Sequence, residues 1–269
     1  MLRLSQRRFE IPLQSGTTRL VEWADDGIVL AVRPHGEGSA IVSMLTRAHG
    51  RHAGLARGAS STRGRGTYQP GNKLQVEWRA RLAEHLGTWN VELSESHVAH
   101  LLEDPLRLAG LSSVCAVADA SLPEREPHPR LFDGLEALLM AMSDPDLGEL
   151  WVATYVSWEI GLLSELGYGL DLESCAATGT NDDLAYVSPR TGRAVSLAAG
   201  EPYRDKLLAL PRFLIGAGGG DSDDLFKGLA LTGFFLERHV FATHGRHPPP
   251  ARNRFVERFV KEATLPSGG

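Results

Sequence analysis

The sequence predicts an α+β protein in which a small closed β-barrel precedes a helical domain that carries a short insert. Three observations lead to this fold class. Between residues 27 and 95, short runs of alternating apolar and polar residues are separated by turns that contain Gly or Pro. After residue 95 the apolar spacing becomes helical. Residues 171–200 interrupt that pattern with two turns, GTNDD and SPRTG, which bracket two strand-like runs.

The barrel is predicted from five short strands that follow one another closely. Turns such as PHGEGS and RAHGR are typical of antiparallel connections. Five antiparallel strands of this length close into a small barrel of the OB or SH3-like kind. The strands are expected at residues 27–33, 40–46, 52–57, 73–82 and 87–93.

The fourth strand alternates most clearly between its two faces. The face expected to pack into the core carries Leu74, Val76, Trp78, Ala80 and Leu82. The opposite face, predicted to be a cationic surface, carries Lys73, Gln75, Glu77, Arg79 and Arg81.

Helices are predicted from apolar residues that recur every three to four positions. Leu131, Leu135, Leu138, Leu139 and Met142 lie on one helical face. The segment GAGGGDSDD is predicted to be a linker that ends in a helix N-cap, since no Gly-Lys-Ser/Thr follows to make a phosphate loop. The helices are expected at residues 128–144, 148–167, 222–243 and 251–262.

The composition is that of an ordinary globular protein, with 269 residues, a net charge of -5 and 42% hydrophobic residues. The most apolar stretch, residues 150–170, contains Glu159 and Glu165, which predicts a buried helix rather than a membrane span. Two cysteines without a disulfide framework fit a reducing compartment, so a cytoplasmic location is expected. Residues 1–20 lack the features of a signal peptide and are expected to be a disordered extension or the product of an upstream start codon.

Residues 47–81 are unusually basic, with seven Arg, one Lys and a single carboxylate, Glu77. Residues 58–71 are rich in Gly, Ser and Arg, so a mobile loop is expected there rather than a helix. Such a concentration of positive charge favours phosphate backbones, with an acidic protein or water alone as the alternatives. The predicted nucleic-acid-binding residues are Arg47, Arg51, Arg57, Arg63, Arg65, Lys73, Arg79 and Arg81, together with Tyr68, which is expected to be free to stack on bases.

A second basic segment lies near the C-terminus, at residues 246–261. Its possible binding residues are Arg252, Arg254 and Arg258. Two roles remain open for this segment, an extension of the nucleic-acid path or a docking site for an acidic protein tail.

The sequence contains no signature of a metal site or of catalysis. Cys175 has Thr178 at the position where a zinc site needs a second ligand, so no metal is predicted. Cys115 lies in an apolar helical run and is expected to be a buried thiol. The motifs of serine, zinc and cysteine hydrolases are missing from the chain, and we predict that it is not an enzyme. An RNA-binding barrel and an enzyme with a site built from dispersed residues remain as alternatives.

Several ordered stretches resemble the bacterial RecO family of DNA repair and recombination mediators. They are VEWADDGIVLAVRPHGEGSAIVSMLTRAHGR, RGASSTRGRGTYQPGN, HLGTWNVEL, ELGYGLDLESCAATG, YVSPRTGRAVS and AGEPYRDKLLALP. The resemblance implies an OB-type barrel at residues 21–98, a helical domain at 99–170 and 201–265, and a zinc-finger-like insert at 171–200.

The same resemblance implies a function in the RecF pathway: binding of single- and double-stranded DNA and annealing of complementary strands. The implied partners are RecR, the acidic C-terminal tail of single-strand-binding protein and, indirectly, RecA, with a location at the nucleoid. Family members that hold zinc carry two Cys-x-x-Cys pairs. Here Cys175 remains, Thr178 replaces its partner, and Ser196 and Ala199 stand approximately where the second pair falls. The insert is therefore expected to be metal-free, and neither a cofactor nor a membrane is implied.

Overall fold

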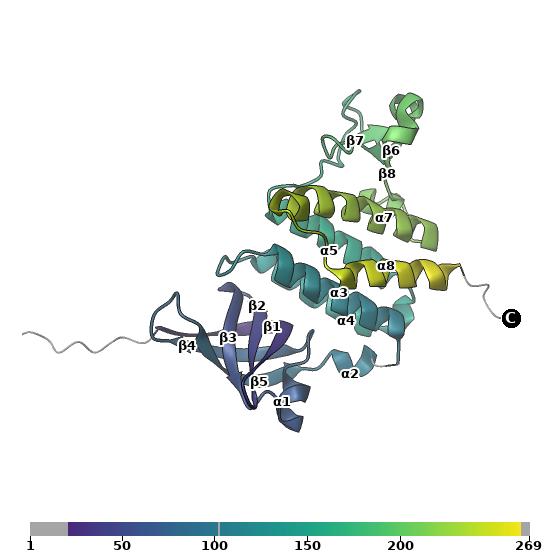
Figure 1. Cartoon of the computed structure of the whole chain (residues 1–269). Helices are drawn as coiled ribbons and strands as arrows, with labels where there is room; N and C mark the ends of the chain where they lie inside the picture. The colour runs from purple at the N-terminus through teal and green to yellow at the C-terminus, as the bar shows by residue number, and fades with distance from the viewer. Residues whose placement is uncertain (1–20, 102, 265–269) are drawn as a thin grey trace, which may run out of the picture.

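The molecule consists of a barrel, a stack of helices and a small sheet at the end far from the barrel (Figure 1). The computed structural model describes residues 21–101 and 103–264. The extension predicted at residues 1–20 lies outside these ranges. Within them, no helix combines the length and the apolar character needed to cross a membrane.

The five predicted strands are confirmed, and they form a closed barrel in the order β1-β2-β3-β5-β4. Closure depends on the long first strand, which pairs with β2 along one part and with β4 along another. This strand order, with a short helix between β3 and β4, is an OB-type barrel. The strands are β1 (Val21–His35), β2 (Ser39–Thr46), β3 (Gly50–Arg57), β4 (Lys73–Ala80) and β5 (Gly87–Glu95).

The segment between β3 and β4 contains a short helix, α1 (Thr62–Thr67), where the sequence predicted only a loop. The prediction was wrong because polar caps replace the apolar periodicity that sequence analysis looks for. The Ser61 hydroxyl accepts a hydrogen bond from the Gly64 amide at 3.0 Å and so caps the first turn. At the other end, the buried Asn72 side chain donates to the carbonyl oxygens of Gly66 and Thr67.

The barrel and the helical domain share strand β1. Val29 packs inside the barrel, whereas Ile28 and Leu30 on either side of it belong to the core of the helical domain. A break in the β1–β2 register between Val29 and Ala31 accompanies this arrangement. As predicted, Trp78 lies in the barrel core, where it is 1% exposed. The barrel core also contains Ala40, Val42, Met44, Ala56, Leu74, Val76 and Trp89.

The helical domain surrounds one large apolar cluster, and its helices lie close to the predicted ranges. The long prediction at residues 222–243 divides into α7 and a following π-helical segment, η4 (Leu236–Phe241). As expected, Asp221 caps α7 by accepting from the Asp224 amide at 2.8 Å. The α-helices are α2 (Val98–Leu101), α3 (Pro105–Ser121), α4 (Pro129–Ser143), α5 (Trp151–Glu165), α7 (Ser222–Phe235) and α8 (Pro250–Ala263). Short helical turns are η1 (Pro145–Leu147), η3 (Arg212–Ile215) and η5 (Ala242–His244).

The insert forms a three-stranded sheet in the order β7-β6-β8. The third strand extends this sheet beyond residue 200, because Tyr186 and Val187 pair with Ala209 and Leu208. The elements are β6 (Leu184–Val187), β7 (Ala194–Ser196), α6 (Leu197–Gly200), η2 (Glu201–Lys206) and β8 (Leu208–Ala209).

Candidate nucleic-acid interface

Three of the predicted arginines lie together at the end of β3 and on α1. Arg57 is the last residue of β3, and Arg63 and Arg65 project from α1. All three side chains are exposed, and no carboxylate in the described ranges pairs with them. They therefore form a positively charged surface that is available to a polyanion.

A further arginine, Arg33, lies on the same outer face of the barrel. Arg33 of β1 pairs with Ile41 of β2, and Ile41 pairs with Leu55 of β3. Two residues further along, His35, Ser39 and Arg57 form the next row on the same face. The Arg33 side chain is 69% exposed and pairs with Asp119 at 2.8 Å. Sequence analysis missed Arg33 because it lies outside the basic segment, at the last position of the first predicted strand.

Tyr68 is not available for stacking on bases. It is 8% exposed and belongs to the barrel core, directly after α1. Desolvation by this burial raises the pKa of its hydroxyl. The expectation of a free aromatic side chain was wrong because the loop that was expected to hold it is folded into the helix and packed against the barrel.

Arg47 and Lys73 connect the barrel to helix α4 instead of standing free in solvent. Arg47 contacts the carboxylate of Asp133, bonds to Glu136 at 3.1 Å, and lies 4.6 Å over the Phe132 ring. Lys73 binds the same Glu136, and this hydrogen bond raises the pKa of the lysine. We therefore leave both cations out of the exposed interface.

Arg51 also belongs to the contact between the two domains. Its Nε donates to the Leu122 carbonyl oxygen at 2.8 Å, and its guanidinium lies 3.4 Å from Asp119 and 3.5 Å from Glu124. These partners lie at the end of α3 and just after it, so Arg51 holds that segment against β3.

The predicted cationic face of β4 is balanced by acidic neighbours. Arg79 pairs with Glu22 of β1 at 2.8 Å and with Glu77 of its own strand at 3.2 Å. Asp26 and Glu92 lie beside Gln75 on the two adjacent strands. The expectation of a cationic surface was therefore wrong, because Glu22, Asp26 and Glu92 from outside the basic segment join Glu77 beside these cations. Arg81, just past β4, is exposed.

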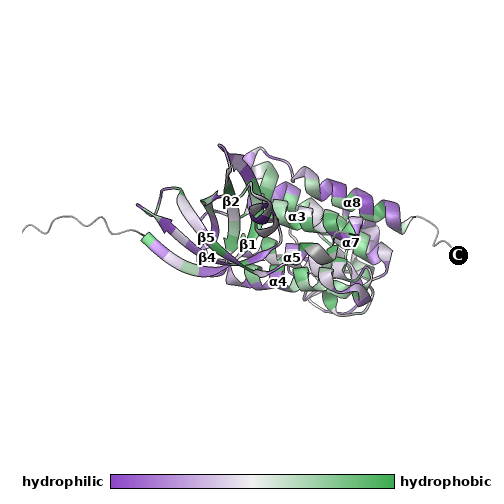
Figure 2. Cartoon of the chain, turned by 90° about the horizontal axis from the view of Figure 1, so that it is seen from below, coloured by the Kyte–Doolittle hydropathy of each residue, from purple (hydrophilic) through white to green (hydrophobic). Residues whose placement is uncertain are grey.

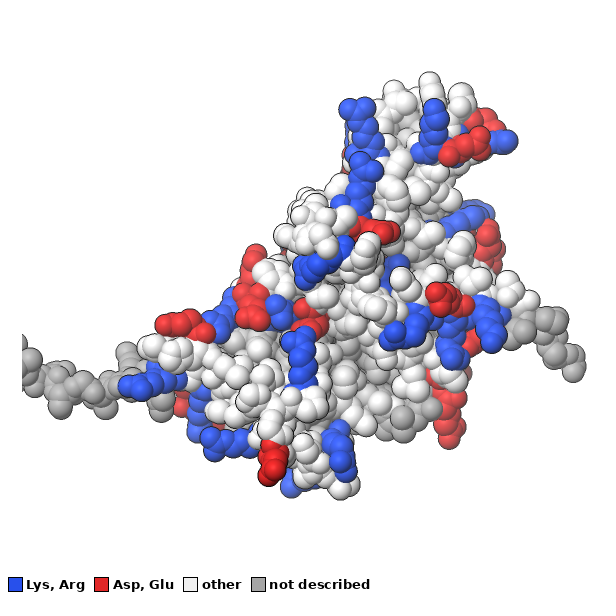
Figure 3. Space-filling model, in the orientation of Figure 1, with Lys and Arg blue, Asp and Glu red and all other residues white. Residues whose placement is uncertain are grey.

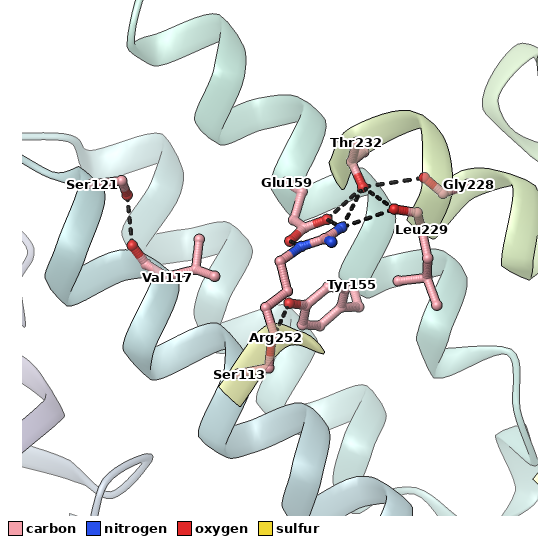
Figure 4. A network of polar contacts seen from close by, with 9 residues as sticks. All are labelled: Ser113, Val117, Ser121, Tyr155, Glu159, Gly228, Leu229, Thr232 and Arg252. Carbon is pink, nitrogen blue, oxygen red and sulfur yellow. Dashed lines mark hydrogen bonds and ion pairs between the residues drawn. The ribbon is translucent and has the colours of Figure 1, made fainter. Parts of the chain in front are cut away.

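Arg252, expected at a surface site, is instead buried in the core of the helical domain (Figure 4). Its guanidinium donates two hydrogen bonds to Glu159, at 2.7 and 2.8 Å, and others to the Leu229 carbonyl and Thr232. Burial lowers the pKa of Arg252, but Glu159 more than offsets this and raises it. The residue is therefore corrected from a binding residue to a structural one.

Arg254 and Arg258, in contrast, lie on the exposed side of α8. With Lys261 they border a groove of about 660 Å³ between α8 and α3, whose apolar lining includes Leu108 and Ala109. Figure 2 shows how hydrophilic α8 is, and Figure 3 shows Lys and Arg gathered over it with carboxylates among them. The groove thus combines apolar residues with a mixed border, in which Glu257 and Glu262 accompany the three cations and Glu262 pairs with Arg258.

Cys175, Thr178 and Ser196 stand at the positions of zinc ligands in a zinc finger, and the insert brings them close together. Here hydrogen bonds connect them. The buried Cys175 thiol donates to the Ser196 hydroxyl at 3.4 Å and accepts from the Ser196 amide at 3.3 Å. Desolvation raises the pKa of this thiol, but hydrogen bonds from Ser196 and Thr178 outweigh it and lower the pKa to about 6. No group of three or more metal-ligating side chains occurs in the described part of the chain. Cys115 is buried as predicted, and its burial raises the pKa of the thiol to about 12.

These features define the chain as an OB-type barrel protein whose barrel is joined to a helical domain with a small sheet. The family model described as Recombination protein O N terminal matches residues 20–97, and Recombination protein O C terminal matches residues 102–247. The chain therefore belongs to the RecO family.

Relatives named DNA repair protein RecO match most of the chain. The one from Rhodospirillum centenum is 59% identical over 246 residues, which span 91% of this chain and 97% of the relative. The one from Phenylobacterium zucineum is 50% identical over 246 residues, which span 91% of this chain and all of the relative. The one from Rhodospirillum rubrum is 49% identical over 243 residues, which span 89% of this chain and 96% of the relative.

Proposed function

We propose that this protein is a DNA-binding mediator of DNA repair and recombination that binds strands through the outer face of its barrel. The observation that carries this proposal is the group of exposed, unpaired arginines at one end of the barrel, Arg57, Arg63 and Arg65. Membership of the RecO family and the relatives' name, DNA repair protein, support it. Arg81, just past β4, is a further exposed arginine, whereas Arg33 is paired with Asp119.

The mechanism follows from charge neutralisation. Flexible arginines bind phosphates without reading bases, so single- and double-stranded DNA are both ligands and sequence preference is slight. When such a surface holds two strands at once, it lowers their mutual repulsion and promotes annealing without any chemical reaction. The protein is thus proposed to act at the nucleoid by binding rather than by catalysis, with RecR and RecA as further partners in the pathway.

The test is DNA affinity as a function of salt concentration. Each phosphate contact changes the slope of log affinity against log salt by about 0.7 to 0.9, so an Arg57/Arg63/Arg65→Ala variant should lose about two to three units of slope. An Arg190/Arg204/Lys206→Ala variant removes the same charge at the insert and should keep the wild-type slope. An unchanged slope in the barrel variant would rule out this surface. Competition with RNA of the same sequence separates a DNA mediator from an RNA-binding barrel protein.

We further propose that the groove between α3 and α8 receives the acidic C-terminal tail of single-strand-binding protein. Its border contains Arg254, Arg258 and Lys261, which suit carboxylates, and its floor contains Leu108, which suits an apolar side chain. An Arg254/Arg258→Ala variant should lose binding of a labelled tail peptide but keep binding of DNA. Loss of DNA binding with retained tail binding would instead make this segment part of the DNA path.

A further inference from the structure

Strand β5 has an open edge for most of its length. On one side it pairs with β4 from Thr88 to Glu95. On the other side it pairs with β3 at only two positions, Gly54 with Gly87 and Leu55 with Thr88. Beyond Thr88 the two strands diverge, and no other strand in the described ranges pairs with β5 on this side. The open edge from Asn90 to Glu95 is about 20 Å long at the usual rise per residue.

The open edge borders a large groove rather than lying against other parts of the protein. The groove has a volume of about 1370 Å³ and is bordered on one side by α1 and on the other by β5 and the outer face of β4. Residues 90–93 of β5 all line it. Leu93 is 43% exposed, which is unusual for a large apolar side chain beside an unpaired strand edge.

The charges in the groove select against DNA and in favour of a basic protein segment. The sheet side carries Asp25, Asp26, Glu77 and Glu92, and the α1 side carries Arg57 and Arg63. Asp25 is bonded to His49 and Glu77 to Arg79, whereas Asp26 and Glu92 have no ion pair within the described ranges. A polyanion that entered the groove would meet the acidic side directly. An extended segment with basic residues at alternate positions would place them beside Glu92 of β5, while its backbone pairs with β5.

We propose that the open edge of β5 binds a protein partner by strand addition, and that the partner supplies an extended segment with basic residues at every second position. Main-chain hydrogen bonds to residues 90–95 supply the affinity, and the exposed carboxylate of Glu92 on β5 supplies the specificity for basic residues. The inference does not rest on DNA binding. It places a partner beside Arg57 and Arg63, which border the same groove, so that protein and DNA would meet at α1.

The test uses a fluorescein-labelled peptide, acetyl-Thr-Arg-Val-Arg-Val-Arg-Thr-amide, added to the full chain without DNA. Two isomers carry N-methyl groups either on the Arg amides or on the Val and last Thr amides, so that each blocks one edge of the extended peptide. We expect the parent to bind, one isomer to bind at least about tenfold more weakly, and the other to bind as the parent does, since a strand pairs through one edge. No binding of the parent, or equal effects of the two isomers, would overturn the proposal.

Two variants locate the site. Glu92→Lys reverses a charge in the groove and should weaken the parent peptide about tenfold. Glu84→Lys makes the same change on the exposed β4–β5 loop, outside the groove, and should leave the affinity unchanged. Equal weakening by both variants would show a general charge effect and would overturn the assignment. The DNA affinity of the wild-type chain is measured in parallel. If this chain binds the peptide but not DNA, only the proposed function is refuted.

Discussion

The barrel carries two groups of cations, one on α1 and the last residue of β3 (the α1 end) and one that faces α4 (the helical-domain end), and they use the same residue types in opposite ways. At the α1 end, Arg57, Arg63 and Arg65 are exposed and unpaired within the described ranges. At the helical-domain end, Arg47 and Lys73 are held by carboxylates of α4. All five come from one continuous basic segment. The comparison shows that, in this segment, the positive charge stays exposed and unpaired only where the fold brings no carboxylate to it.

Helix α8 offers the sharpest version of this contrast, because Arg252 is buried and Arg254 is exposed two residues away. Arg252→Met leaves Glu159 uncompensated in the core and should lower the free energy of unfolding by about 3–5 kcal/mol. Arg254→Ala is the matched control and should change it by less than about 0.5 kcal/mol. Denaturant titration of both variants measures the difference. Equal free energies of unfolding for the two variants would mean that the buried Arg252 contributes no more to stability than the exposed Arg254.

Tyr68 tests whether the α1 end contains a base-stacking residue. Tyr68→Ala should cost about 3 kcal/mol of stability, because it empties part of the barrel core. The folded fraction should keep its DNA affinity, measured by anisotropy under conditions where the variant is native. A loss of about 1–3 kcal/mol in DNA binding at unchanged stability would identify Tyr68 as a stacking residue instead.

The helical-domain end is tested by a double-mutant cycle on Lys73 and Glu136. These side chains are only 14% and 21% exposed, so Lys73→Met and Glu136→Gln should show a coupling of about 1–2 kcal/mol. The exposed pair of Arg204 and Glu201 is the control and should show at most about 0.5 kcal/mol. If the Lys73 coupling were absent and Lys73→Met flattened the salt slope of DNA binding, the lysine would belong to the interface.

The smallest effect is expected at Arg79. Glu22 and Glu77 already neutralise its charge, so Arg79→Ala should leave the salt slope of DNA binding within about 0.3 units of the wild type. Arg57→Ala, a single change at the α1 end, should reduce the slope by about 0.7 to 0.9 units. A larger effect of Arg79 than of Arg57 would reverse the comparison between the two surfaces.

The sequence predicted most of the fold because alternation and helical spacing are local signals. Trp78 was placed in the core by its parity with Val76, and a helix N-cap was placed at the end of GAGGGDSDD by its position before an apolar run. The start of β1 at Val21 was missed, since two Asp residues precede its apolar part. Helix α1 was missed because its caps are polar and it has no apolar stripe.

The binding site was harder to predict than the fold, because pairing partners lie far apart in the chain. Arg47, just after β2, pairs with Asp133 of α4, and Arg252 of α8 pairs with Glu159 of α5. No local sequence pattern predicts such ion pairs, so the exposed arginines could not be distinguished from the paired ones. The open edge of β5 was also hidden, since it depends on where two strands diverge.

The sharing of β1 between two cores makes the barrel an inseparable part of the chain. Ile28, Leu30 and Leu45 belong to barrel strands, yet they pack with the helices. A fragment that ended after the barrel would expose these three side chains to water and would be prone to aggregate. The barrel and the helical domain are therefore expected to fold as one unit, because residues of β1 and β2 complete the core of the helices.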